Sequence, residues 1–138
     1  MRIAHPMGLA VAVVLQLVLL SSCTTPVPAT VTRAPATPLK SNLKIFVQAT
    51  VQQGRIVESL RNAGIDAQES LPGADYTLLV KVGRNRRSTQ CGGISNVAYL
   101  LSDEGRYVLV IKGRGLTGSC RPNIFDEMSY MLSSYVGS

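Results

Sequence analysis

The sequence contains a single histidine, His5, and it lies within the first few residues of the chain. Histidine is the commonest general base near neutral pH and the commonest metal ligand, so its absence from the remaining residues argues against both roles. The Gly-x-Ser-x-Gly turn of hydrolases and the Gly-x4-Gly-Lys loop of nucleotide-binding proteins are also missing. We therefore expect no enzyme, no metal site and no cofactor. A hydrolase built on lysine or aspartate alone is the alternative that these absences leave open.

Acidic residues are scarce too: eight stand against 14 lysines and arginines, which gives a formal net charge of +6. The adjacent acids, Asp103 with Glu104 and Asp126 with Glu127, point apart on a strand or helix, which disfavours a shared acid–base site. Such a charge balance favours anionic partners, although it can equally be a solvated face that aids solubility. The basic residues gather in the second half of the chain: Lys81, Arg84, Arg86, Arg87, Arg106, Lys112, Arg114 and Arg121.

No apolar run is long enough to cross a membrane. The longest, Met7 to Leu20, is interrupted by Gln16 and is shorter than the ~18–20 residues that a span requires. With Arg2 before it, this run has the pattern of a secretory signal peptide over residues 1–22. Its end, Leu20-Ser21-Ser22-Cys23, resembles a bacterial lipobox. That resemblance implies cleavage before the cysteine and a diacylglycerol on its thiol.

An anchor of this kind would hold the protein on the membrane permanently, since it has two or three acyl chains and each buried CH₂ contributes about 0.8 kcal/mol. Thr24 follows the cysteine at a position where aspartate often marks inner-membrane retention. The resemblance therefore implies the outer membrane, on its periplasmic face. The alternatives are an uncleaved transmembrane helix and an ordinary signal peptide with a cysteine at the cut by chance.

The residues that follow have the composition of a spacer. Residues 23–41 lack apolar periodicity and contain four prolines: Pro26, Pro28, Pro35 and Pro38. This composition predicts an extended tether, which at about 3 Å per residue would lift a domain some tens of Å off the bilayer. Residues 42–138 are then long enough for one domain with a modest core.

The first half of this domain predicts a strand, a helix and a second strand. Lys44–Ala49 is rich in β-branched and aromatic residues, which favours a strand. Thr50 with Gln53 has a capping-box pattern, and apolar residues at helical spacing predict a helix of about 12 residues that ends at Gly64. Asp75–Val82 alternates apolar and polar residues, as a half-buried strand does.

The second half predicts a hairpin and a helix. Ile94–Leu101 and Arg106–Gly113 flank turn residues 102–105, whereas residues 84–93 have the composition of a loop. An apolar stripe after Asn123 predicts the second helix. The order β-α-β-β-β-α indicates an α+β two-layer sandwich, with two helices on one face of a mostly antiparallel sheet of about four strands.

Cys91 and Cys120 remain once Cys23 is assigned to the lipid. They flank the predicted hairpin, so its folding brings the two thiols toward each other. An oxidising periplasm favours a disulfide between them. Its closed loop of about 30 residues would stabilise the fold by roughly 3–4 kcal/mol. The alternatives are a redox pair, which usually has closer spacing, and a metal site, which needs further ligands.

One passage has a recognisable pattern: a helix ending in Gly64-Ile65, then a strand that begins Ala74-Asp75-Tyr76. It is similar to small α/β domains of the TolB amino-terminal, curli-secretion and penicillin-binding-protein-activator types, which belong to the bacterial envelope. The resemblance implies a non-enzymatic assembly or regulatory module.

We therefore expect a lipid-anchored binding module that docks on an envelope protein complex. One alternative is a binder of anionic lipid or glycan through Arg84, Arg86 and Arg87, and another is an accessory subunit of a secretion or lipopolysaccharide-export machine. A weak structural role, in which those arginines are dispensable, is the third. Nucleic acid is not an expected partner in the periplasm.

Replacing Cys23 with serine is expected to abolish lipid attachment, because serine has no thiol to carry a thioether. In a bacterial host fed labelled palmitate, the wild-type chain takes up the label and the Cys23→Ser chain does not, as gel imaging and mass spectrometry would show. The matched control, Cys91→Ser, keeps the label. Equal labelling of Cys23→Ser and wild type would refute the lipoprotein hypothesis.

Overall fold

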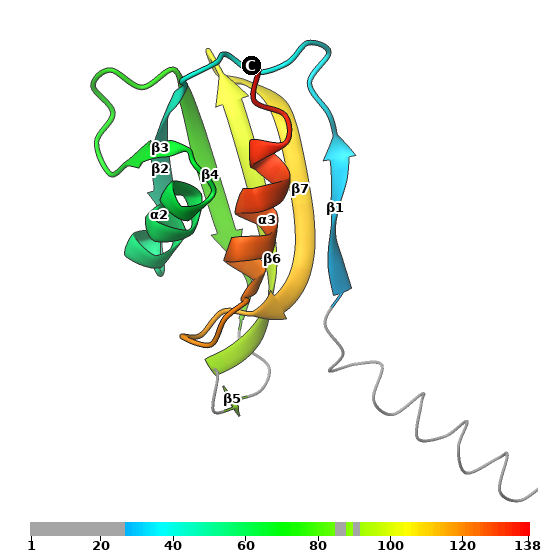
Figure 1. Cartoon of the computed structure of the whole chain (residues 1–138). Helices are drawn as coiled ribbons and strands as arrows, with labels where there is room; N and C mark the ends of the chain where they lie inside the picture. Colours follow the sequence, from blue (N-terminus) through cyan, green and yellow to red (C-terminus); the bar gives the residue numbers. More distant parts are fainter. Residues whose placement is uncertain (1–26, 85–87, 90–91) are drawn as a thin grey trace, which may run out of the picture.

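The computed structural model describes residues 27–84, 88–89 and 92–138, and in it two helices cover one face of a mixed β-sheet (Figure 1). The strands follow one another in the order β1-β7-β6-β4-β2-β3. Their bounds are β1 Val27–Arg33, β2 Lys44–Ala49, β3 Asp66–Gln68, β4 Tyr76–Val82, β6 Gly92–Asp103 and β7 Arg106–Leu116. The helices are α2 Gln53–Asn62 and α3 Ile124–Ser133, and the two-residue strand β5 Ser88–Thr89 pairs with β6 outside this order.

The predicted α+β sandwich with two helices on one face is confirmed, but the sheet of about four strands is wrong. Six strands lie side by side in the path, and the two that the sequence did not indicate, β1 and β3, are the edges. The sheet is mixed because β2 runs parallel to both β3 and β4, whereas the pairs β4–β6, β6–β7 and β7–β1 are antiparallel. β3 has only three residues, too few to show an alternating pattern.

The segment predicted as a tether contains β1, so the start of the domain moves from residue 42 to residue 27. Within it, Ala29 is buried, Val31 packs on the core and the side chain of Leu39 is almost fully buried. The backbone at Leu39 is also held, because its N–H donates to the carbonyl of Tyr135 at 2.8 Å. Pro28 is compatible with a strand here because β1 is an edge strand and its register with β7 is interrupted between Val27 and Thr30.

The predicted end of the first helix is confirmed, and its predicted start is wrong. Gly64 has φ +85°, and the N–H of Ile65 donates to the carbonyl of Leu60 at 3.0 Å, which is the bond pattern of a glycine-terminated helix. At the other end the capping residue is Gln52, not Thr50, and its side chain makes no capping bond. The Gln53 side chain instead donates to the carbonyl of Val47 at 2.7 Å and ties the helix to β2.

The second helix begins with a reciprocal cap. Asn123 Oδ1 accepts from the N–H of Asp126 at 2.9 Å, and the carboxylate of Asp126 accepts from the N–H of Asn123. Its apolar stripe is buried against the sheet, where the hydroxyl of Tyr99 lies 3.1 Å from that of Ser129. Burial raises the pKa of Tyr99 far above its ordinary value, so this phenol stays neutral.

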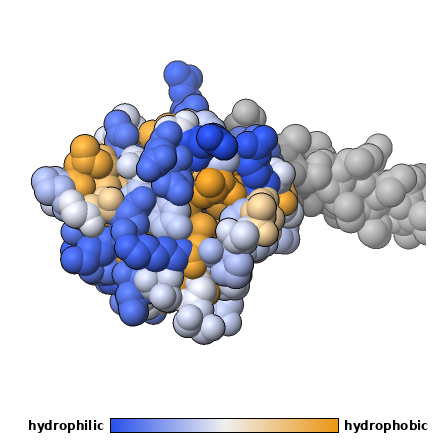
Figure 2. All heavy atoms as spheres, turned by 90° about the horizontal axis from the view of Figure 1, so that it is seen from above, coloured by the Kyte–Doolittle hydropathy of each residue, from blue (hydrophilic) through white to orange (hydrophobic). Residues whose placement is uncertain are grey.

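The predicted hairpin is confirmed and extends beyond its predicted arms. Its two-residue turn is Glu104-Gly105, both with positive φ (51° and 81°), as a type I′ turn requires. Seen from above, the end of the molecule that carries the C-terminus is mostly hydrophilic, with apolar residues in small patches (Figure 2).

Substituting Gly113 with alanine should destabilise the fold, because the new Cβ would lie 3.0 Å from Cδ1 of Ile124 and 3.1 Å from Cα of Ala29. We expect a loss of about 1–3 kcal/mol, typical of an overpacked contact. The control Gly54→Ala meets nothing within 4 Å and should stabilise α2 by up to about 1 kcal/mol. Thermal unfolding of the full-length protein in neutral detergent measures both, and equal effects would contradict this packing argument.

Candidate functional site

The two faces of the sheet carry different side chains. On the face under α2 and α3, strand residues such as Leu78, Val80 and Leu109 are buried. On the opposite face, Leu79, Leu100 and Val110 form one row across β4, β6 and β7, and each is only half-buried. Among the described residues, no helix lies over this second face (Figure 1). We call it the open face.

A row of basic and small residues follows directly on the open face. Side chains two positions apart on a strand share a face, so Lys81, Ala98 and Lys112 lie next to the apolar row, aligned across β4, β6 and β7. One row further, Asn96 is aligned with Arg114.

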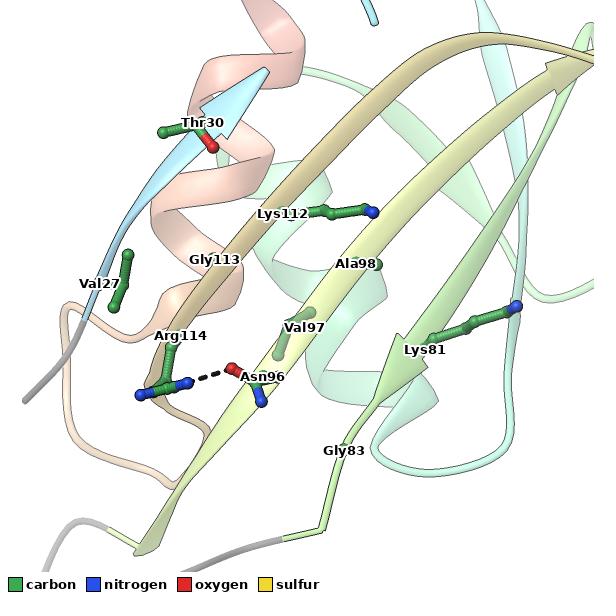
Figure 3. Close-up of a pocket in the computed structure, with 10 residues that line it drawn as sticks. All are labelled: Val27, Thr30, Lys81, Gly83, Asn96, Val97, Ala98, Lys112, Gly113 and Arg114. Atoms are coloured by element: carbon green, nitrogen blue, oxygen red, sulfur yellow. Dashed lines mark hydrogen bonds between the residues drawn. The ribbon is translucent and has the colours of Figure 1, made fainter. Parts of the chain in front are cut away.

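These rows line a groove with a volume of about 430 Å³ (Figure 3). Val27 and Thr30 from β1 and Gly83 after β4 complete its walls. The small residues Gly83 and Ala98 leave space between the longer cationic side chains. We call this site the basic groove, defined by Lys81, Lys112 and Arg114.

The charges of the basic groove are uncompensated by its own lining, which contains no carboxylate. Arg114 Nε donates to Asn96 Oδ1 at 2.8 Å, which positions the guanidinium beside a neutral partner (Figure 3). In the part of the chain that the structure describes, the ion pairs are Lys40–Asp75 and Arg121–Glu58, neither of which involves a groove residue. The groove therefore has the chemistry of an anion-binding surface.

Two acids lie on the other side of Arg114, where a second groove of about 580 Å³ runs between β1, β7 and α3. Glu127 Oε1 accepts from the N–H of Ala29 at 2.9 Å, and Asp126 accepts from Ser59 Oγ at 2.8 Å. Both carboxylates thus have structural roles, one tying α3 to β1 and the other tying α3 to α2.

Only part of the predicted binding loop is described. Arg84 is exposed and directly follows Gly83 of the basic groove, whereas Arg86 and Arg87 lie outside the described residues. The sequence shows Lys81, Lys112 and Arg114 as basic residues but does not indicate that they form one site. These residues form one site because they lie on the same face of paired strands. Recognising this requires the register between the strands.

The predicted disulfide remains a prediction. Cys120 lies between β7 and α3, and Cys91 and Cys23 lie outside the described residues. Next to the predicted pair, the N–H of Thr117 donates to the carbonyl of Gly93 at 3.0 Å, so the flanks of the hairpin do lie together.

Two other features are absent from the described ranges. No group of three histidine, cysteine, aspartate or glutamate residues could hold a metal ion there. Nor is any described helix both long enough and apolar enough to cross a bilayer.

Comparison with known proteins relates the fold to solved structures. No protein-family model and no curated protein matches the chain. Two structures of PelC from Paraburkholderia phytofirmans, each a dodecamer, are similar to it. One, of a leucine-to-methionine variant, has 21% identity and a TM-score of 0.50, with 80% of this chain and 91% of that chain covered. The other has 17% identity and a TM-score of 0.53, with 83% and 100% covered. At these identities the likeness establishes the fold.

The three cations should be dispensable for stability, because the two lysines are exposed and Arg114 donates to Asn96, whose side chain is exposed. We expect Lys81→Gln, Lys112→Gln and Arg114→Gln each to change the free energy of unfolding by less than about 0.5 kcal/mol. Thermal unfolding of the full-length variants tests this. A larger loss would mean that the cations serve the fold.

Proposed function

We propose that this chain is a lipid-anchored, non-enzymatic assembly module of the bacterial cell envelope, and that it works as a homo-oligomer on the periplasmic face of the outer membrane. The observation that carries the proposal is the shared fold with PelC, a dodecamer, over at least 80% of either chain. The anchor comes from the lipobox-like end of the N-terminal apolar run.

The edges of the sheet give an assembly its physical basis. An edge strand presents unpaired backbone N–H and C=O groups, to which another chain can add. β1 is the longer edge, with seven residues, whereas β3 has three. If β1 of one copy meets a different surface of the next copy, the contact is head-to-tail. Such contacts close into a ring when the rotation between neighbouring copies is a whole-number fraction of a full turn.

The second groove, which runs between β1, β7 and α3, supplies a surface for such a contact, and we call it the apolar groove. Its apolar lining consists of Val27 and Pro28 of β1, Leu116 of β7 and Tyr130 of α3, and Arg114, Asp126 and Glu127 also line it. The Tyr130 side chain is 75% exposed and Val27 is 46% exposed, so large apolar groups face water in the isolated chain. Tyrosine is enriched at the energetic centre of interfaces. We assign a second copy of this chain as the occupant of this groove.

Assembly on a membrane would concentrate copies of one surface in a plane. That arrangement suits a module that docks on an envelope protein complex, because many weak contacts act together. We propose an envelope protein complex of this kind as the partner of the assembly.

Native mass spectrometry of the full-length lipidated protein in neutral detergent tests the assembly. We expect one dominant species whose mass is a whole-number multiple of the protomer mass. Tyr130→Ser should weaken self-association by about 30-fold, since loss of a central interface tyrosine costs about 2 kcal/mol.

The matched control is Tyr107→Ser on β7, because Tyr107 is also exposed (43%) but does not line this groove. A monomer at every concentration would overturn the homo-oligomer. An oligomer that Tyr130→Ser leaves intact would place the interface elsewhere.

A further inference from the structure

The basic groove lies close in sequence to the predicted anchor. Val27 forms part of its wall and is only four residues after Cys23. Four residues span at most about 14 Å, even when fully extended. If Cys23 carries the lipid, the edge of the groove that Val27 forms is therefore held within that distance of the lipid-bearing residue. The tether of some tens of Å that the sequence predicted would have allowed no such conclusion.

The groove also has the charge that a bilayer of anionic lipids attracts. Lys81 from β4 and Lys112 and Arg114 from β7 line this groove, and no carboxylate does. Arg84, one residue beyond the groove, is exposed and adds a fourth positive charge at the same end of the sheet. Each basic residue near an anionic membrane surface strengthens binding about fivefold.

We propose that the basic groove docks on the phosphate groups of anionic phospholipids in the membrane that holds the anchor. The proposal rests on the lipid anchor of the proposed function and adds a second, reversible membrane contact to it. The half-buried row of Leu79, Leu100 and Val110 adjoins the cations on the open face. Cationic heads beside apolar side chains match the boundary between headgroups and acyl chains.

A second copy of the chain fits the basic groove less well than the membrane does. The chain carries a net charge of +6, so two copies meeting at their cations would repel each other. The apolar groove assigned above to a second copy lies on the other side of Arg114. Val27 and Arg114 line both grooves, so the membrane and the neighbouring copy would occupy adjacent surfaces that share these two residues.

Lysine footprinting on vesicles tests the docking. Full-length lipidated protein is reconstituted into vesicles of phosphatidylcholine, with or without phosphatidylglycerol, and recovered by flotation. Acetylation of each lysine by a water-soluble reagent is then followed by mass spectrometry. We expect Lys81 and Lys112 to react at least about fivefold more slowly when phosphatidylglycerol is present, and high salt to remove the difference.

Two controls separate docking from general effects of charge. Lys44 is exposed at the start of β2, at the opposite end of the sheet from the groove, and should react equally in both vesicles. Arg114→Gln should reduce the protection of both groove lysines. Arg106→Gln, which removes an exposed charge from the other end of β7, should leave that protection unchanged.

The remaining outcomes would overturn the proposal or its premise separately. Protein that floats with both vesicles but shows equal rates at the groove lysines keeps the anchor and refutes the docking. Flotation only with phosphatidylglycerol supports the docking and refutes the anchor, and flotation with neither refutes both. Slow reaction in both vesicles would assign the groove to a second copy. Protection by added polygalacturonate, but not by phosphatidylglycerol, would assign it to an anionic glycan.

Discussion

The register of β4, β6 and β7 is the constraint on which the rest of the structure depends. Since successive side chains of a strand alternate between faces, a single register puts Leu78, Val80 and Leu109 under the helices and puts Lys81 and Lys112 on the open face. A slip of one residue would bury the lysines and expose the core. The type I′ turn at Glu104-Gly105 fixes this register locally, and helix packing enforces it over the whole sheet.

The sequence predicted the elements that have a strong local pattern. β2 has the predicted bounds, β4 differs by one residue, and the glycine-terminated end of α2 was correct. β1 was missed because Pro28 and the prolines on either side of the strand favour a spacer, and because its partner strand, β7, lies far along the chain. Likewise, the predicted site followed the run of arginines at 84–87, whereas the basic groove depends on residues that are close only after the strands pair.

The folded domain begins at residue 27 and not at the predicted residue 42, which shortens the segment between the predicted lipid site and the domain. A long spacer would have made the folded domain independent of the membrane, with its charged surfaces free to face in any direction. Because β1 begins at Val27, the groove and the predicted lipid site belong to one small region.

The pairing of β1 with β7 also sets an order in which the chain can fold during export. The side chain of Thr32 reaches the carbonyl of Val110, 78 residues later, so β1 cannot pair with β7 until most of the chain has been made. Contacts between distant segments form late, after local hairpins and helices. The stretch beside Cys23 should thus stay open to processing enzymes while the remainder is delivered. The edge that completes the sheet would then close last and, under the proposed lipid anchor, after Cys23 is modified.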